Sequence, residues 1–198
     1  LIENITPKIN NIKVGPYNDE TSDMGPVVSK DAYDRINGLI DSGIEEGANL
    51  IVDRRNIKLQ GYENGYFIGP CLFDNVKDNM KIYKEEIFGP VLSIVRAKNY
   101  EEGLQLVKDN PYGNGCSIFT RDGDTARNFS SEANIGMVGV NIPIPVPVAY
   151  FSFGGWKNSI FGGHNAYGME AIRFYTHTKT ITSKSVSYTH LTLPTKLS

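Results

Sequence analysis

The sequence is poor in cysteine, which narrows the classes of protein to which it can belong. Its 198 residues contain two cysteines, Cys71 and Cys116, with no CxxC pair. This excludes a disulfide framework and the usual zinc-ligand spacing, although a single disulfide between the two stays open. This low number of cysteines is typical of proteins in a reducing compartment and predicts a cytoplasmic location. Neither thiol has a neighbouring helix N-terminus or cation to lower its pKa, so both are predicted to be structural and not catalytic.

Long apolar runs and an excess of one charge are also missing. Lys and Arg number 20 against 22 Asp and Glu, giving a formal charge of −2, and the basic residues are scattered along the chain. A nucleic-acid partner is therefore not expected. Every apolar stretch is interrupted before it reaches membrane-spanning length, so no membrane partner is expected either. The hydrophobic content of 40% is enough for a domain with its own core.

The common catalytic signatures are absent as well. No GxGxxG follows a predicted strand, and there is no GxxxxGK[ST], HExxH or GxSxG. The three histidines, His164, His177 and His190, are far apart and have no acidic or cysteine partner at ligand spacing. Each is predicted to be a surface or hydrogen-bonded histidine. No metal site and no catalytic residue is assigned.

What is present is an alternation of strand and helix patterns. Helices are predicted from the Ser29 N-cap to Gly47, over 99–111 and over 122–134; strands are predicted within 49–53, 66–76, 88–99, 113–120 and 135–141. This order predicts the α/β class, with a mostly parallel twisted sheet flanked by helices. Residues 1–141 would form that α/β part.

The chain changes character after residue 141. Three prolines spaced two apart begin a stretch, 142–168, that cannot be an interior strand or helix. A loop this long is more often functional than not. A short helix (168–176) and a β-rich segment, TKTITSK, complete the predicted segment 142–184, and TKTITSK could pair with another subunit's sheet edge. The tail, 185–198, looks non-native and is set aside. The absence of an initial Met predicts a fragment that lacks its beginning.

Two stretches offer candidate functional residues. In KEEIFGPV (84–91), Glu85 and Glu86 form either a solvated turn or a ligand site in which a carboxylate accepts two hydrogen bonds from a ribose diol, since loops at strand ends in parallel α/β folds bind ligands. In GGWKNSIFGG, the paired glycines predict either a flexible surface loop or a loop over a cleft. In the second case Phe151, Phe153 and Trp156 would line an apolar pocket.

Taken together, the chain resembles the aldehyde dehydrogenase superfamily. KEEIFGPVLSIV, NPYGNGCSIFT, FSFGGWKNS and TKTIT resemble four of its motifs in order and spacing. Within the superfamily it resembles the CoA-acylating methylmalonate-semialdehyde (malonate-semialdehyde) dehydrogenase branch, through GYENGYFIGPCLFDNV, GMVGVNIPIPVPVAYFSF and IRFYTHTKTIT. The resemblance covers about residues 1–184 and corresponds to the C-terminal part of such an enzyme.

The resemblance implies specific roles. Glu86 would bind the nicotinamide-side ribose hydroxyls of NAD, Phe88 would pack near the nicotinamide ring, and Phe153 would line the substrate pocket. The strand around Thr178–Thr182 would join a neighbouring subunit in a homo-oligomer, either a dimer or a tetramer. Ser152 departs from the proline common in the wider superfamily.

The resemblance also implies the reaction of the parent enzyme. It would convert methylmalonate or malonate semialdehyde and CoA to propionyl-CoA or acetyl-CoA and CO₂, with NAD as cofactor and CoA as co-substrate. The nucleophilic cysteine and most of the cofactor domain of that family lie outside this chain, so the chain alone is expected to be inactive. Two alternatives stay open: an ordinary acid-forming aldehyde dehydrogenase, or a non-enzymatic fragment that only pairs subunits.

Overall fold

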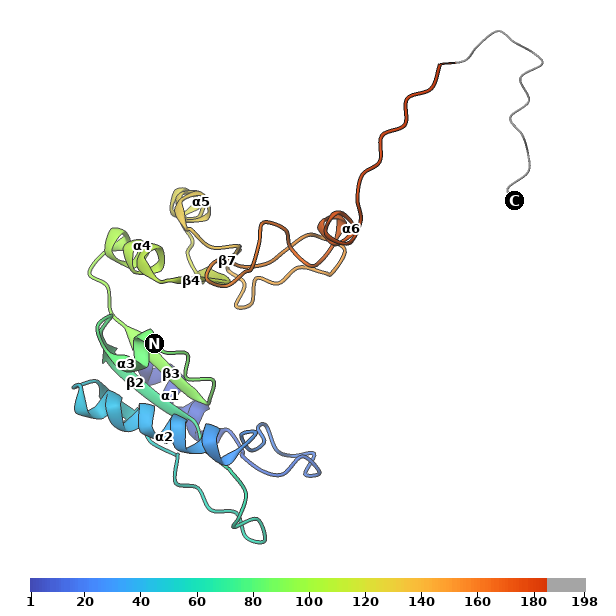
Figure 1. Cartoon of the computed structure of the whole chain (residues 1–198). Coiled ribbons are helices and arrows are strands. Elements are labelled where there is room, and N and C mark those ends of the chain that lie inside the picture. Colours follow the sequence, from blue (N-terminus) through green and yellow to red (C-terminus); the bar gives the residue numbers. More distant parts are fainter. Residues whose placement is uncertain (185–198) are drawn as a thin grey trace, which may run out of the picture. The chain divides into compact units, whose positions relative to one another are not determined.

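The computed structural model describes residues 1–184 and divides the chain into two compact units, Leu1–Val107 and the residues from Lys108 onward (Figure 1). The division at 107/108 follows the packing of the chain, and the three-part organisation predicted with a boundary at 141/142 stays a prediction. The tail, 185–198, lies outside the described residues.

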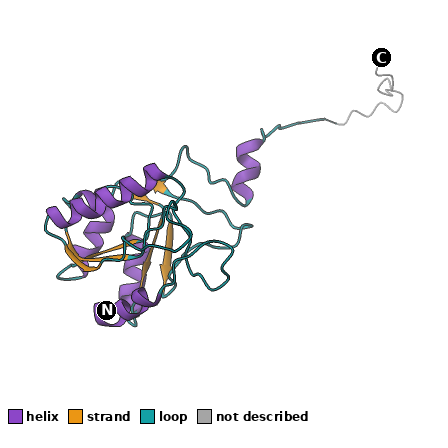
Figure 2. Cartoon of the chain, turned by 90° about the horizontal axis from the view of Figure 1, so that it is seen from below, coloured by secondary structure: helices purple, strands orange, loops and turns teal. Residues whose placement is uncertain are grey.

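The first unit contains three helices and three strands: α1 (Ile2–Asn11), α2 (Lys30–Glu45), β1 (Asn49–Val52), β2 (Cys71–Val76), α3 (Lys81–Lys84) and β3 (Val91–Val95). Helix α4 (Tyr100–Asp109) begins in this unit. The second unit contains β4 (Tyr112–Gly113), β5 (Gly115–Ile118), α5 (Gly123–Glu132), β6 (Met137–Val140), β7 (Trp156–Lys157) and α6 (Met169–Tyr175). Figure 2 shows these elements coloured by type.

The strands of the first unit form one sheet in the order β1–β2–β3. Strands β2 and β3 are parallel, with Cys71 opposite Val91, whereas β1 and β2 are antiparallel, with Leu50 opposite Phe73. The prediction of a mostly parallel sheet is therefore right for β2 and β3 and wrong for β1. The physical reason is the connection: residues 53–70 contain no helix to carry the chain across the sheet, as a parallel pairing would require.

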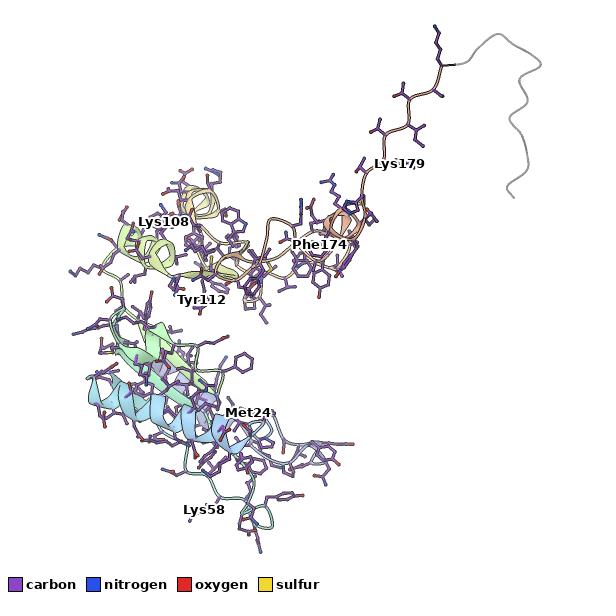
Figure 3. All side chains as sticks on the ribbon, in the orientation of Figure 1. Met24, Lys58, Lys108, Tyr112, Phe174 and Lys179 are labelled. Carbon is purple, nitrogen blue, oxygen red and sulfur yellow. The ribbon has the colours of Figure 1, made fainter. Side chains whose placement is uncertain are left out.

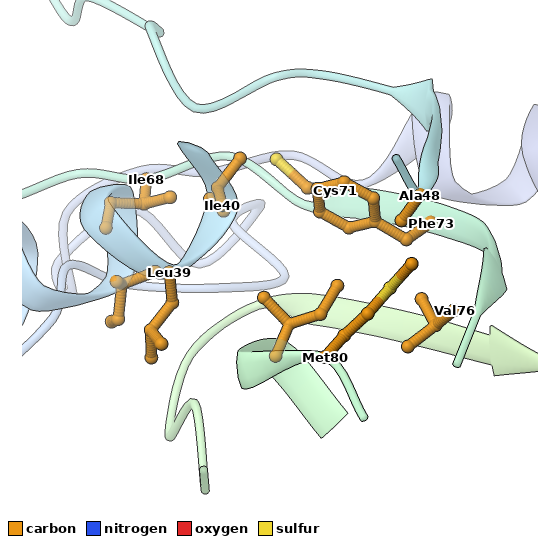
Figure 4. Packing of buried hydrophobic residues seen from close by; sticks show 10 residues of the cluster. Leu39, Ile40, Ala48, Ile68, Cys71, Phe73, Val76 and Met80 are labelled. Atoms are coloured by element: carbon orange, nitrogen blue, oxygen red, sulfur yellow. The ribbon is translucent and has the colours of Figure 1, made fainter. Parts of the chain in front are cut away.

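Both faces of this sheet are covered, each by a different helix. On one face, Ile36, Leu39 and Ile40 of α2 pack with Phe73 of β2 in a cluster that Figure 4 shows at close range. On the other face, Ile9 of α1 packs against Leu72 and Val52. Phe73 and Leu72 are both completely buried, as the alternation of side chains along a strand requires.

Helix α2 forms where the sequence predicts it. The Ser29 hydroxyl accepts a hydrogen bond from the Ala32 amide at 3.1 Å, which satisfies one of the free N–H groups of the first turn. The helix is followed by Gly47, whose φ of 93° reverses the chain direction.

In the second unit, β5 and β6 pair in parallel and α5 connects them, as predicted. Asp122 caps α5 by accepting a hydrogen bond from the Thr125 amide at 2.6 Å. Among the described residues, 176–184 form no helix or strand and are exposed; Figure 3 labels Lys179 in this segment. The pairing of 178–182 with a neighbouring subunit stays a prediction.

Candidate functional site

The first candidate site is the loop 85–90, between α3 and β3. Glu85 ends α3, and its carboxylate lies 3.8 Å from the Lys81 amine one turn earlier. The loop leads into the amino end of β3, where Pro90 accepts a hydrogen bond from the Cys71 amide. The rule for open parallel sheets puts ligands at the carboxyl ends of strands. That rule therefore does not account for a site here, and the assignment of Glu86 depends on the family resemblance.

The backbone of this loop is held by helix α2. The Arg35 guanidinium donates to the carbonyl oxygens of Glu86 and Ile87 at 3.0 and 2.7 Å. The Ile87 side chain packs against the main core cluster. The next residue, Phe88, has a φ of 49°, a left-handed conformation that side chains other than glycine adopt only when the surroundings hold them there.

The two predicted cofactor residues are both exposed at this loop. Phe88 keeps 79% of its surface accessible. Within the described residues, the Glu86 carboxylate forms no ion pair, whereas Glu85 has Lys81 as its partner. The two acids thus differ in their surroundings: Glu85 is exposed and pairs with Lys81, whereas Glu86 is exposed and has no ion-pair partner among residues 1–184. That Glu86 binds a ribose stays a prediction.

The third predicted residue, Phe153, lies in the second unit. Its ring stacks on the ring of Tyr167, with centroids 4.6 Å apart and planes 10° from parallel. Together with Met137, His164 and Phe174 these two rings contribute to the wall of a cavity of about 560 Å³. A cavity of this size with a mostly apolar wall can hold a small organic molecule.

Ser152 has a role that a proline could not perform. Its hydroxyl donates to the Tyr167 carbonyl at 3.1 Å and lies 3.4 Å from the Glu170 amide, so it joins the loop to the start of α6. Gly168 lies between these two partners with a φ of 64°, and a Cβ there would come within 2.7 Å of the Ser152 amide nitrogen. The departure from proline is therefore accompanied by a specific local structure.

The loop 154–163 is anchored to the chain on its amino-terminal side. Strand β7 pairs with β4 in antiparallel register, with Trp156 opposite Gly113. The Lys157 amine donates to the carbonyls of Lys108 and Asn110 at 3.0 and 2.9 Å. Of the two interpretations, a freely flexible loop does not fit this part of the segment.

His164 is hydrogen-bonded, as predicted. Its Nδ1 lies 2.5 Å from one carboxylate oxygen of Glu170, while Arg173 donates to the other at 2.9 Å. The hydrogen bond from His164, with the charge of Arg173, lowers the pKa of Glu170 below its ordinary value of 4.5. A carboxylate thus orients a histidine at the wall of the cavity.

The cysteines have the environment expected of structural residues. Cys71 is 1% exposed and belongs to the core, and Cys116 is half-buried in β5. Burial raises the pKa of both thiols, which is opposite to what a nucleophile needs. No three metal-binding side chains cluster within residues 1–184, and no helix there combines the length and apolar character needed to cross a membrane.

Comparison with known proteins defines the class. The model of the aldehyde dehydrogenase family matches residues 1–181. The chain belongs to the aldehyde dehydrogenase family.

Similar relatives within that family share one kind of name, semialdehyde dehydrogenase. Malonate-semialdehyde dehydrogenase of Pseudomonas aeruginosa is 53% identical over 184 residues, which are 93% of this chain and 37% of that protein. The human mitochondrial acylating methylmalonate-semialdehyde/malonate-semialdehyde dehydrogenase is 49% identical over 174 residues, 88% of this chain and 32% of the relative.

Similar solved structures have names of the same kind. A Sinorhizobium meliloti protein assigned as methylmalonate-semialdehyde dehydrogenase, in complex with NAD, matches with a TM-score of 0.93 and 62% identity, over 95% of this chain and 38% of that one. The methylmalonate-semialdehyde dehydrogenase of Oceanimonas doudoroffii matches with a TM-score of 0.92 and 47% identity, with the same coverage. The chain therefore spans between about a third and two fifths of the length of these relatives.

Two contacts of the site regions escaped sequence reasoning. Arg35 lies in an amphipathic helix, where a basic residue is expected to be solvated. Its hydrogen-bond partners are 51 and 52 residues away in the chain. The partnership of His164 and Glu170 spans six residues that are not in one helix. No local pattern marks either contact, because both depend on how the loops fold back.

Proposed function

We propose that this chain supplies one wall of the cofactor site and part of the acyl pocket of an NAD-dependent, CoA-acylating methylmalonate-semialdehyde or malonate-semialdehyde dehydrogenase. The observation that carries the proposal is the pair Glu86 and Phe88, both exposed on a backbone that Arg35 holds. The NAD complex of the Sinorhizobium meliloti structure and the acylating names of the relatives support it.

The residues of the loop fit a bound nicotinamide nucleoside. An ionised carboxylate only accepts hydrogen bonds, and its two oxygens match the two hydroxyls of a ribose diol, which is the role proposed for Glu86. The exposed Phe88 ring offers an apolar face to the nicotinamide. When bound, NAD accepts a hydride from the substrate.

The second unit would contribute apolar surface to the acyl pocket. Phe153 stacks on Tyr167, and a ring with such a neighbour loses less freedom when a small acyl chain packs on it than an unpaired ring would. In the proposed reaction, malonate semialdehyde, CoA and NAD⁺ give acetyl-CoA, CO₂ and NADH, and the methyl-substituted substrate gives propionyl-CoA. The chain offers no thiol suited to nucleophilic attack among its described residues, so this chain alone is expected to be inactive.

A segment exchange tests the proposal. Residues 1–184 replace the matching segment of the Pseudomonas aeruginosa relative, and NADH formation is followed with malonate semialdehyde in the presence and absence of CoA. CoA-dependent activity is expected. Glu86→Gln in this chimera is expected to raise KM for NAD about tenfold, the loss expected of a hydrogen bond to a charged group. The matched control is Glu85→Gln, which should leave KM unchanged. A folded chimera whose KM responds equally to both changes would refute the role of Glu86.

The alternatives give different outcomes in the same assays. An acid-forming aldehyde dehydrogenase would produce NADH equally well without CoA. A fragment that only pairs subunits would assemble in light scattering while no exchange chimera formed NADH. The 198-residue chain assayed alone with both semialdehydes and CoA is expected to give no NADH, and measurable turnover there would contradict the proposal.

A further inference from the structure

We infer that Arg35 is a positioning residue for the cofactor: it sets the conformation of loop 85–90 and so aims Glu86 and Phe88. The inference rests on the proposed function of that loop. Arg35 lies on α2, and its own partners are backbone carbonyls and not a ligand, so it acts through the loop.

The geometry of the guanidinium explains why one residue can do this. Its two terminal nitrogens donate to the carbonyls of Glu86 and Ile87, which belong to successive peptide planes. The fork of a guanidinium is rigid and planar, so both planes are oriented at once. The second plane contains the backbone nitrogen of Phe88, and the φ of Phe88 is the rotation about the bond from this nitrogen to Cα. Holding that plane fixes one of the two groups whose relative rotation is φ. The close approach of Gly89 to Ile36 limits the other group, and the two constraints together favour the left-handed conformation of Phe88.

A second contact from the same helix supports the arrangement. Ile36, the next residue of α2, is completely buried, and its Cδ1 lies 2.6 Å from where a Cβ on Gly89 would be. The loop is thus pressed against α2 directly after Phe88 and hydrogen-bonded to it directly before. Ile87 adds a third fixed point through its packing in the core.

The charge of Arg35 is available for this role. Within residues 1–184 no carboxylate forms an ion pair with its guanidinium, whereas Lys30 on the same helix pairs with Asp34. A lysine at position 35 would carry the same charge on a single ammonium. It could donate to one carbonyl or share its protons between two, but it has no planar fork with which to orient both peptide planes.

The first test measures the conformation of Phe88 in the 198-residue chain, without NAD. A left-handed residue has a short distance between its own amide and α protons, which gives a strong nuclear Overhauser effect. That signal is expected to be strong in the parent chain and in the control Lys30→Met. It should be weak in Arg35→Met and partly retained in Arg35→Lys. An unchanged signal in Arg35→Met overturns the inference, whatever NAD does.

The second test measures NAD in the segment-exchange enzyme. Arg35→Met is expected to raise KM for NAD about tenfold, as expected when a charge-assisted contact is misplaced, with kcat changed less than KM. Arg35→Lys should recover part of the loss, and Lys30→Met should behave as the parent. If Phe88 loses its conformation while KM stays constant, the positioning role is refuted. If the parent chimera itself fails to use NAD, the proposed function fails, and the first test still decides the loop geometry.

Discussion

A methyl group added at Gly89 would enter the contact between the candidate cofactor loop and α2. In Gly89→Ala the new Cβ would lie 2.6, 3.0 and 3.2 Å from Cδ1, Cγ1 and Cγ2 of Ile36. Ile36 is completely buried, so its side chain can give way only within the packed core. Such overpacking costs about 1–3 kcal/mol, while replacing glycine gains about 0.4–1 kcal/mol from the unfolded chain. The net expectation is a loss of roughly 1–2 kcal/mol.

A double-mutant cycle isolates the contact. Ile36→Val removes Cδ1, the atom nearest to the added methyl, and by itself costs about 0.5–1.5 kcal/mol. In the double variant the same truncation relieves the clash. The double variant should therefore lose about 1 kcal/mol less than the sum of the single changes, a coupling typical of residues in contact.

Native-state hydrogen exchange of the β2 amides provides the measurement, because β2 is the central strand of the sheet in the first unit and reports the opening of that sheet. Gly38→Ala on α2 is the control: nothing lies within 4 Å of its Cβ position, and alanine should stabilise the helix by about 0.5–1 kcal/mol. Additive costs within about 0.3 kcal/mol would show that the two residues are not in contact and would refute the reasoning.

Two further predictions concern the ends of helices. Ser29→Ala removes the acceptor of the Ala32 amide and should destabilise the first unit by about 1 kcal/mol in the same exchange experiment, with Ser29→Asp close to the parent; no loss in Ser29→Ala would exclude the cap. Glu170 has a folded-state pKa below 4.5, so its pairing stabilises the α6 region above that pH and is lost as the pH falls through the lowered value. His164→Ala should raise the pKa of Glu170 toward 4.5 in a carboxyl NMR titration, and an unchanged titration would contradict the contact with His164.

Much of the local structure followed from patterns in the chain. The α2 start at Ser29, an α5 start at Asp122 or Asp124 (Asp122 in the structure) and the α4 stop before Pro111 each depend on contacts within a few residues. Such signals survive without knowledge of the fold. The antiparallel direction of β1 relative to β2 could not be predicted from the sequence, because pairing depends on which strand lies beside β1 and not on its own side chains.

The candidate site also has features that can be read from the sequence and features that only the structure gives. The sequence by itself determined the resemblance to the family, because its motifs can be read in order along the chain. Through that resemblance it also named Glu86, Phe88 and Phe153 as candidate site residues, and their roles stay predictions. Only the tertiary structure decided that Arg35 holds the loop, that Phe153 stacks on Tyr167 and that Ser152 links its loop to α6. These contacts join residues 14 to 52 positions apart, through a guanidinium, a ring and a hydroxyl whose partners exist only once the chain has folded.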